Sequence, residues 1–155
     1  MNTEYIYLYN NFIKLTTNKK LYEGYVETDT FNDRLVFFLL HLTLFFKAFK
    51  KEENSKILQE IYDFCFRQLE LSIREIGYGD QSINKKMKDF LNLFHAMISE
   101  LYLWDKIEKT KKKELFCIFL KNSCKVDYLV DYFDDFYKEL IKKTLNYYLK
   151  SVSNP

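Results

Sequence analysis

Two of the three glycines in this chain stand on either side of one tyrosine, in the stretch Leu71–Lys88, which reads LSIREIGYGDQSINKKMK. Apolar residues at helical spacing precede Gly77, and a second helical pattern follows Gly79. Gly77 suits the left-handed position that often follows a helix end, and Gly79 adds a second permissive backbone. Asp80 or Ser82 can cap the next helix by accepting from its free N–H groups. The stretch therefore predicts a tight corner between two helices.

Residues that interrupt helices are rare in the rest of the chain. Only 3 glycines and 1 proline occur in 155 residues, and the proline is terminal. Hydrophobic residues make up 48% of the chain, so a real core is expected. This scarcity favours a few long helices over many short strands. We predict an all-α fold, a compact single-domain bundle of about five to seven helices over residues 1–150, with a disordered tail at 151–155.

The longest apolar run, Leu35–Phe46, is predicted to be the central, buried helix, because nearly every side of it is apolar. The run is shorter than the roughly 18 residues that would indicate a membrane span. In the helix that follows, Phe64 and Leu71 fall on a second face beside Arg74. The core stripe of that helix is predicted to comprise Leu58, Ile61, Tyr62, Cys65, Phe66, Leu69, Ile73 and Ile76. Further helices are expected at about 4–17, 82–106, 111–122 and 126–150.

Side chains with metal-binding or nucleophilic chemistry form no recognisable site in the sequence. His41 lies within the apolar run and is interpreted as a core histidine satisfied by a hydrogen bond, whereas His95 falls on a polar face. Cys65, Cys117 and Cys124 fit no zinc spacing and are predicted to be reduced thiols in a cytosol-like compartment. GxSxG, P-loop, GxGxxG and HExxH motifs are absent. We therefore expect neither a catalytic site nor a cofactor or metal.

Two charged clusters allow more than one interpretation. The aspartates in the segment 127–135 faintly resemble the magnesium ligands of all-helical prenyl synthases, which would indicate a small magnesium-dependent isoprenoid-diphosphate enzyme. No second aspartate cluster is present to bridge a diphosphate, so a solvated acidic face is favoured. The lysines at 109–113, with those at 85–88, would suit RNA or anionic lipid. A net charge of +2 gives no bulk argument for nucleic acid, and solvated helix starts are the more frequent explanation.

The corner stretch resembles the signature of the ubiquinol–cytochrome c chaperone family, whose pattern runs L-R-E-M-G-V-G-D before a basic stretch ending near K-K-M. A second block, with D-T-F at 29–31, Arg34 and L-H at 40–41, is similar to the family's D-T-F-x-G-R-F…L-H. The resemblance covers about residues 5–102. Asp33 departs from the pattern, as does the segment 94–96. The matching residues of the first block are Arg74, Glu75, Gly77, Gly79, Asp80, Lys85, Lys86 and Met87.

This resemblance implies a non-enzymatic assembly factor for the cytochrome bc1 complex, one that holds newly made cytochrome b until haem and partner subunits arrive. The N-terminus lacks the features of a secretory signal or a transit peptide. We therefore expect a cytoplasmic protein working at the inner face of a bacterial membrane. Peripheral contact with the membrane or the ribosome is left open, and no specific nucleic acid is expected. A generic helical protein-binding adaptor remains an alternative.

We expect the corner and the start of the central helix to lie side by side and to form the partner-binding surface. Charged groups there would make hydrogen bonds roughly twice as strong as neutral ones. The same residues would also suit a bracing role, with Asp80 as a cap, the glycines as a hinge and Arg34 paired with a glutamate. The predicted partner-binding residues are Asp29, Phe31, Arg34, Phe64, Leu71, Arg74, Glu75, Gly77, Tyr78, Gly79, Asp80 and Lys86.

Overall fold

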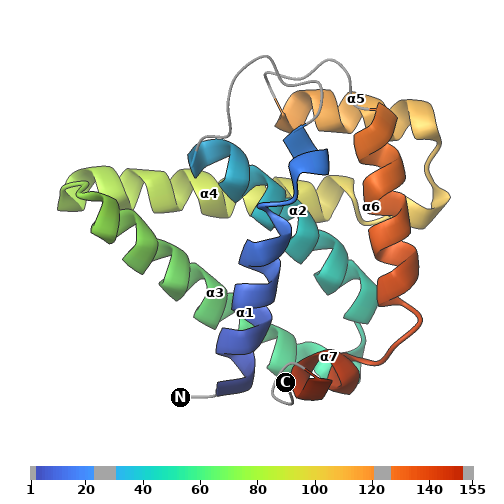
Figure 1. Cartoon of the computed structure of the whole chain (residues 1–155), viewed down its shortest axis with the longest axis horizontal. Helices are drawn as coiled ribbons and strands as arrows, with labels where there is room; N and C mark the ends of the chain where they lie inside the picture. The colour runs from blue at the N-terminus through green and yellow to red at the C-terminus, as the bar shows by residue number, and fades with distance from the viewer. Residues whose placement is uncertain (1–2, 23–30, 121–126, 152–155) are drawn as a thin grey trace.

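All regular structure is helical in the computed structural model, which describes residues 3–22, 31–120 and 127–151 (Figure 1). Three short 3-10 turns lie between the helices, at Lys19–Tyr22, Glu52–Asn54 and Trp104–Lys106. The prediction of an all-α bundle of five to seven helices is confirmed. The α-helices of the described residues are α1 (Thr3–Leu15), α2 (Phe31–Phe49), α3 (Ser55–Ile76), α4 (Asp80–Glu100), α5 (Lys109–Phe119), α6 (Asp127–Leu140) and α7 (Leu145–Ser151).

Helix α2 lies at the centre of the bundle and packs against α1, α4 and α6. Phe37, Phe38 and Phe45 on this helix are at most 1% exposed, and the polar residues His41 and Thr43 are buried to the same degree. An apolar helix needs neighbours to cover it, and α1, α4 and α6 cover most of α2 between Leu35 and Phe45. The predicted central helix is therefore confirmed.

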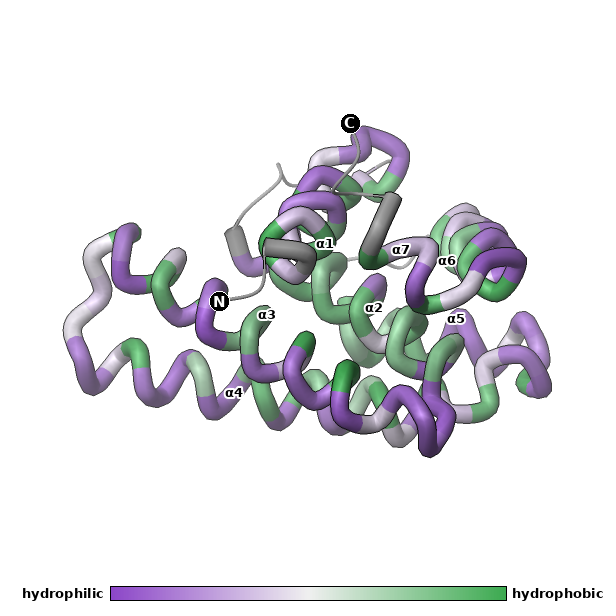
Figure 2. The backbone as a smooth tube through the Cα atoms, turned by 90° about the horizontal axis from the view of Figure 1, so that it is seen from below, coloured by the Kyte–Doolittle hydropathy of each residue, from purple (hydrophilic) through white to green (hydrophobic). Residues whose placement is uncertain are grey.

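Helices α3 and α4 form a hairpin whose far end projects away from the other helices (Figure 1). Hydrophobic and hydrophilic residues alternate in short runs along α4, as expected for a helix with one buried face (Figure 2). The base of the hairpin packs on α2 through α4 and on α1 through α3. Its tip reaches beyond this cover, and every residue from Arg74 to Asp80 is exposed.

The buried stripe of α3 differs from the predicted one at Phe64, near the middle of the helix, and at Ile76, its last residue. Phe64, which the prediction placed on a second face, is buried because the rings of Tyr5 and Tyr9 on α1 lie against it, with centroids 6.1 and 6.4 Å away. Ile76, which was predicted to be buried, is 52% exposed because it lies at the tip of the hairpin, where no other helix reaches.

The continuous helix predicted at 126–150 is wrong, since the chain turns between α6 and α7. The Tyr148 hydroxyl donates to the carbonyl oxygens of Glu139 and Leu140, 3.1 Å from each, at the end of α6. The same ring packs on Phe45 and Phe49 of α2. The contacts of α7 with α1 and of Tyr148 with α2 therefore override a local sequence that contains no glycine or proline to end the helix.

The helix predicted at 82–106 ends early, at Glu100. After it the chain bends so that Trp104 becomes 1% exposed, with its ring 5.4 Å from that of Phe116 on α5. Among the described helices, none combines the length and the hydropathy that a membrane-spanning segment needs.

Candidate functional site

The corner between α3 and α4 has the hinge that the sequence predicts at Gly77. This residue has φ 104° and its N–H donates to the carbonyl oxygen of Arg74 at 3.0 Å. Gly79 has an ordinary extended conformation, with φ −71° and ψ 163°. A Cβ atom at either glycine would meet nothing within 4 Å. The backbone conformation, not close packing, therefore calls for glycine, and it does so only at Gly77.

Asp80, one of the two predicted capping residues, does not cap α4. Gly79 occupies the cap position, no side chain there makes a capping hydrogen bond, and Asp80 is the first helical residue. The Asp80 carboxylate instead accepts a hydrogen bond from Arg74 Nη1 at 3.0 Å, across the corner. This pair braces the two helices, but both side chains are exposed, so its contribution to stability is small.

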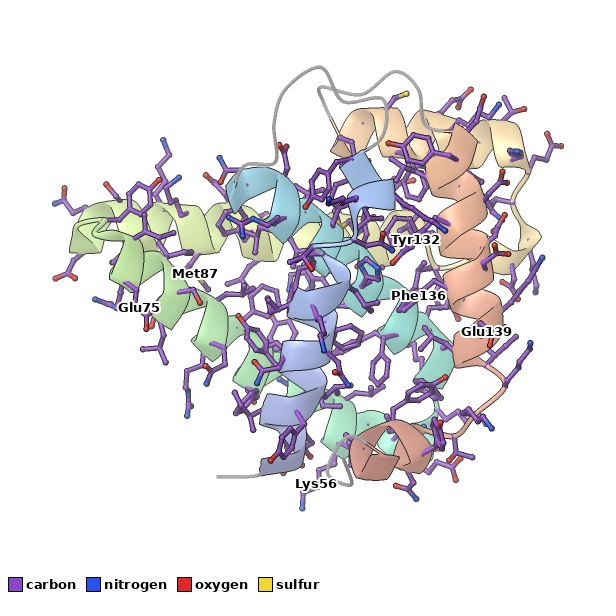
Figure 3. The ribbon with its side chains drawn as sticks, viewed as in Figure 1. Lys56, Glu75, Met87, Tyr132, Phe136 and Glu139 are labelled. Carbon is purple, nitrogen blue, oxygen red and sulfur yellow. The ribbon has the colours of Figure 1, made fainter. Side chains whose placement is uncertain are left out.

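Apolar and cationic side chains surround this brace. Leu71, Ile76 and Tyr78 are 40–52% exposed, and Lys86 Nζ lies 4.6 Å from the centroid of the Tyr78 ring. Glu75 lies near the end of α3 on the same part of the hairpin (Figure 3). The corner thus presents apolar area and charges of both signs to the outside, without using them to pack the bundle.

The second motif block lies elsewhere. Arg34 is exposed near the start of α2 and lines a small cleft with Leu69 and Ser72 of α3 and with residues of α1. In Figure 1 the start of α2 and the tip of the hairpin lie well apart. Arg34 thus lies near α3 at Leu69 and Ser72, but the start of α2 does not lie beside the Gly77–Asp80 tip, contrary to the expectation from the sequence.

Three of the predicted partner-binding residues are buried or lie partly or wholly outside the described residues. Phe64 is buried beneath α1, so it is not available at the surface. Asp29 lies outside the described residues, and of Phe31 only the backbone, at the start of α2, is described. A role in partner binding stays a prediction for the others: Arg34, Leu71, Arg74, Glu75, Gly77, Tyr78, Gly79, Asp80 and Lys86.

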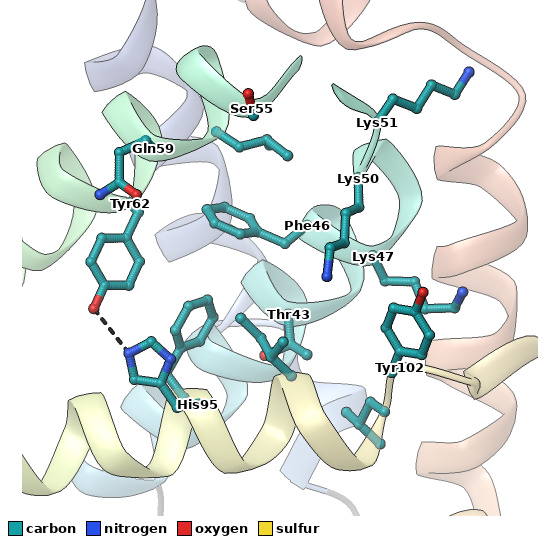
Figure 4. Close-up of a pocket in the computed structure, with 14 residues that line it drawn as sticks. Thr43, Phe46, Lys47, Lys50, Lys51, Ser55, Gln59, Tyr62, His95 and Tyr102 are labelled. Atoms are coloured by element: carbon teal, nitrogen blue, oxygen red, sulfur yellow. Dashed lines mark hydrogen bonds between the residues drawn. The ribbon is translucent and has the colours of Figure 1, made fainter. Parts of the chain in front are cut away.

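A groove of about 430 Å³ opens between α2, α3 and α4, and no motif in the sequence pointed to it (Figure 4). Its floor is apolar, and the ring of Phe94 and the side chain of Leu101 in it are at most 1% exposed. At one wall the Tyr62 hydroxyl lies 3.2 Å from Nε2 of His95. The groove is lined by Thr43, Phe46, Lys47, Lys50, Lys51, Ser55, Leu58, Gln59, Tyr62, Phe94, His95, Ile98, Leu101 and Tyr102.

Lysines form the rim of this groove, and its lining includes no acidic residue. Lys47 is paired with Asp105, at 3.3 Å. Burial favours the protonated form of Asp105, but the hydrogen bond and the charge of Lys47, a backbone hydrogen bond and the charge of Lys106 together outweigh it, so the pKa of this carboxyl group is lowered. Lys50 Nζ lies 5.0 Å from the centroid of the Tyr102 ring. Among the described residues, neither Lys50 nor Lys51 forms a salt bridge, so the rim carries two uncompensated charges.

The buried histidine is a structural residue, as predicted. His41 Nδ1 donates to the carbonyl oxygen of Phe37 at 2.6 Å, which leaves Nε2 to accept from the Tyr132 hydroxyl at 2.8 Å. Tyr132 and Phe136 point from α6 toward α2 and enclose the imidazole (Figure 3). Burial lowers the pKa of His41 to about 4 and raises the pKa of Tyr132 to about 12. His41 is therefore neutral and hydrogen-bonded at both nitrogens.

Three of the four aspartates of α6 are paired with lysines of α5. Lys109 and Lys112 of α5 pair with Asp131 at 3.1 Å and with Asp134 at 2.7 Å, and Lys113 pairs with Asp127. Hydrogen bonding to Lys113 lowers the pKa of Asp127. The two clusters that the sequence presents as solvated faces are thus partners of each other. Three or more side chains able to hold a metal do not gather anywhere in the described residues.

Two of the cysteines can be placed. Cys65 is buried in α3, where burial raises the pKa of its thiol to about 12, and it packs as a small apolar residue. Cys117 is exposed and free, and Cys124 lies outside the described residues.

Comparison with known families places these features in context. Residues 27–103 match the family model described as ubiquinol–cytochrome C chaperone. The matched segment holds α2, α3 and α4, both motif blocks and every residue that lines the groove. Searches of curated proteins and of solved structures found no match. The segment 27–103, about half of the chain, belongs to the ubiquinol–cytochrome c chaperone family.

Proposed function

We propose that this protein is a non-enzymatic assembly factor for the cytochrome bc1 complex and that it binds newly made cytochrome b. The observation that carries the proposal is the match of residues 27–103 to a chaperone family of ubiquinol–cytochrome c reductase. The described part of that segment presents surface that the fold does not use, at the α3–α4 corner and in the groove. Unused apolar surface with fixed charges beside it is typical of protein-binding sites.

The corner suits a contact with a partner more than a purely bracing role. Gly77, the carbonyl oxygen of Gly79 that accepts from the Ile83 N–H, and the exposed Arg74–Asp80 pair serve the local fold. Tyr78 is 40% exposed and touches Lys86, not the core. An exposed aromatic ring beside cationic groups is a frequent anchor in protein interfaces. The corner therefore offers a rigid contact surface, because α3 and α4 are held by their own packing at the base of the hairpin.

In this proposal the protein acts in the cytoplasm, at the inner face of the membrane, where loops and helix ends of a newly inserted cytochrome b are accessible. Holding such a segment requires binding that is specific but reversible, since partner subunits must later replace the chaperone. Small surfaces with a few charged contacts provide this, because their affinity is moderate and their dissociation fast.

Deletion of the gene tests the function directly. We expect membranes of the deletion strain to lose the b-type and c-type haem absorbance of the bc1 complex, as measured by reduced-minus-oxidised difference spectra. A copy of the gene supplied in trans should restore it. Unchanged spectra in the deletion strain would remove the proposal.

Substitutions at the corner test the contact surface. We expect Tyr78→Ala and Arg74→Ala to keep the melting temperature within a few degrees while co-purification of cytochrome b falls by about tenfold, because both side chains are exposed. Tyr147→Ala is the matched control, as Tyr147 is 46% exposed on α7, outside the matched segment. A corner variant that unfolds, or that keeps its full yield of cytochrome b, contradicts the contact surface.

A further inference from the structure

We propose that the groove between α2, α3 and α4 is a second binding site, and that it takes an acidic amphipathic helix of a partner protein. The inference rests on the proposed function for the existence of a protein partner, but it concerns a different surface from the corner. Its occupant follows from three properties of the groove: its shape, its charge and the kind of backbone that borders it.

The shape fits the apolar side chains of a helix. A volume of about 430 Å³ lies within the range of pockets that enclose a ligand. The floor is formed by α2, α3 and α4 together, so it is part of the rigid bundle (Figure 4). Phe46 and Ile98 are partly buried there and pack against the core, which leaves one face of each open to an incoming side chain.

The charge of the rim selects for carboxylates. Lys47, Lys50 and Lys51 stand along one side, and Lys106 joins Lys47 and Lys50 around a small adjoining cleft. Of these four lysines, Lys47 alone has a carboxylate partner among the described residues, Asp105. A helix with glutamates or aspartates beside its apolar face would complete the pairing of Lys50 and Lys51 as its apolar residues enter the groove. Such complementarity sets both the orientation and the rate of association.

The border of the groove favours a helix over other occupants. Peptides that bind as an added strand need an exposed sheet edge, and the described residues contain no strand. A bilayer is a poorer fit, because its surface cannot enter a concavity whose apolar floor residues Leu58, Phe94 and Leu101 are at most 7% exposed. A helix laid between two helices reaches such a floor with side chains spaced by three and four residues.

The test uses the full-length protein and a designed, fluorescently labelled peptide of about 18 residues, or five helical turns, with leucines on one face and glutamates flanking them. We expect the acidic peptide to bind, as measured by fluorescence anisotropy, and we expect its affinity to fall as the salt concentration is raised. A second peptide with lysine in place of every glutamate should bind at least about tenfold more weakly. Binding of both peptides with equal affinity overturns the proposal.

Two pairs of variants locate the binding. The double variant Lys50→Glu/Lys51→Glu should bind the acidic peptide about tenfold or more weakly than the wild type. The control is Lys85→Glu/Lys88→Glu, which makes the same charge change at exposed sites outside the groove and should leave the affinity unchanged. Gln59→Trp, which fills the groove from an exposed position in its wall, should also abolish binding. Lys56→Trp is its control, since Lys56 is exposed on the same helix and does not line the groove.

Other results count against the proposal. Absence of peptide binding by the wild-type protein overturns it. Equal affinity of the acidic peptide for the wild type and for the Lys50→Glu/Lys51→Glu variant also overturns it. Co-sedimentation with vesicles containing anionic phosphatidylglycerol that is lost in the same reversal, without peptide binding, assigns the groove to a membrane surface instead. None of these measurements involves cytochrome b, so they can fail while deletion still abolishes the bc1 complex. An unchanged bc1 complex in the deletion strain, conversely, leaves the peptide result standing.

Discussion

His41 shows how one residue can couple the stability of the bundle to pH. Its imidazole is fully buried and neutral, and burial lowers its pKa from 6.5 to about 4. An unfolded chain binds a proton at pH values where the folded protein does not. The stability that depends on a neutral His41 is therefore present above pH 6.5, and it is lost as the pH falls toward 4.

We expect the free energy of unfolding to fall by about 3 kcal/mol between pH 6.5 and 4, at 1.36 kcal/mol for each unit of pKa shift. Urea denaturation across this range measures it. His41→Gln should flatten the dependence, because an amide does not titrate, although the variant should be less stable throughout. His95→Gln should leave it intact, since His95 is exposed. An identical pH profile for wild type and His41→Gln would falsify this role.

Residues whose environment depends on local sequence could be predicted, and residues whose environment depends on other helices could not. The left-handed Gly77 follows from its place between two helical patterns, and the core role of His41 follows from the apolar run around it. Phe64 and Ile76 were assigned wrongly, because their burial is decided by how far α1 extends along α3. The hydrophobic periodicity of the α3 sequence does not show how far α1 extends along that helix.

At the scale of elements, α5 and α6 are joined by charge as well as by packing. Their three lysine–aspartate pairs differ in burial: the side chains of Lys112 and Asp134 are only 10% and 27% exposed, whereas those of Lys109 and Asp131 are 51% and 64% exposed. Lys112 Nζ also lies 4.3 Å from the centroid of the Trp104 ring. Removal of Asp134 would leave this ammonium group desolvated without a counter-charge.

We therefore expect Asp134→Ala to lower the free energy of unfolding by about 3 kcal/mol and Asp131→Ala by less than about 1 kcal/mol. Urea denaturation at pH 7 compares the two. The double variant Lys112→Met/Asp134→Leu should recover most of the loss, because it replaces the pair by apolar groups of similar volume. Equal losses for the two single variants would show that burial of the pair does not matter.

Element boundaries followed from sequence only where a glycine or a periodic pattern marked them. The start and end of the α3–α4 corner are in this class. The break between α6 and α7 is not marked in the sequence. It depends on hydrogen bonds from Tyr148 to the end of α6, and Tyr148 reaches that end only once the chain has turned back. The pairing of α5 lysines with α6 aspartates was likewise hidden, because each cluster reads as a solvated face until the other helix is placed beside it.

On the scale of the whole molecule, the matched segment 27–103 depends on helices outside it. Phe38 of α2 packs on Tyr9 and Phe12 of α1, with ring centroids 5.4 and 6.2 Å away, and His41 bonds to Tyr132 of α6. The groove could not be predicted for a related reason, since its floor exists only when three helices meet. In the sequence, the groove is indicated only by the three closely spaced lysines at 47, 50 and 51.

We expect residues 27–103, when produced alone, to remain helical by far-UV circular dichroism but to bind the dye ANS and to self-associate on gel filtration, because two sides of α2 are then uncovered. The full chain under the same conditions is the control and should show neither property. If the segment is monomeric, unfolds cooperatively and does not enhance ANS fluorescence, then α1 and α5–α7 are dispensable for the fold.

The enclosure of α2 between Leu35 and Phe45 bears on how sequences of this kind can diverge. A substitution within α2 must satisfy neighbours in all directions at once, whereas α1, α6 and α7 each face it with one side only. Mutational drift should therefore be slowest in this central helix and fastest on the outward faces of the helices around it. Relatives could even carry unrelated flanking helices, provided that these supply aromatic rings of comparable bulk where Tyr9, Phe12 and Phe133 now stand.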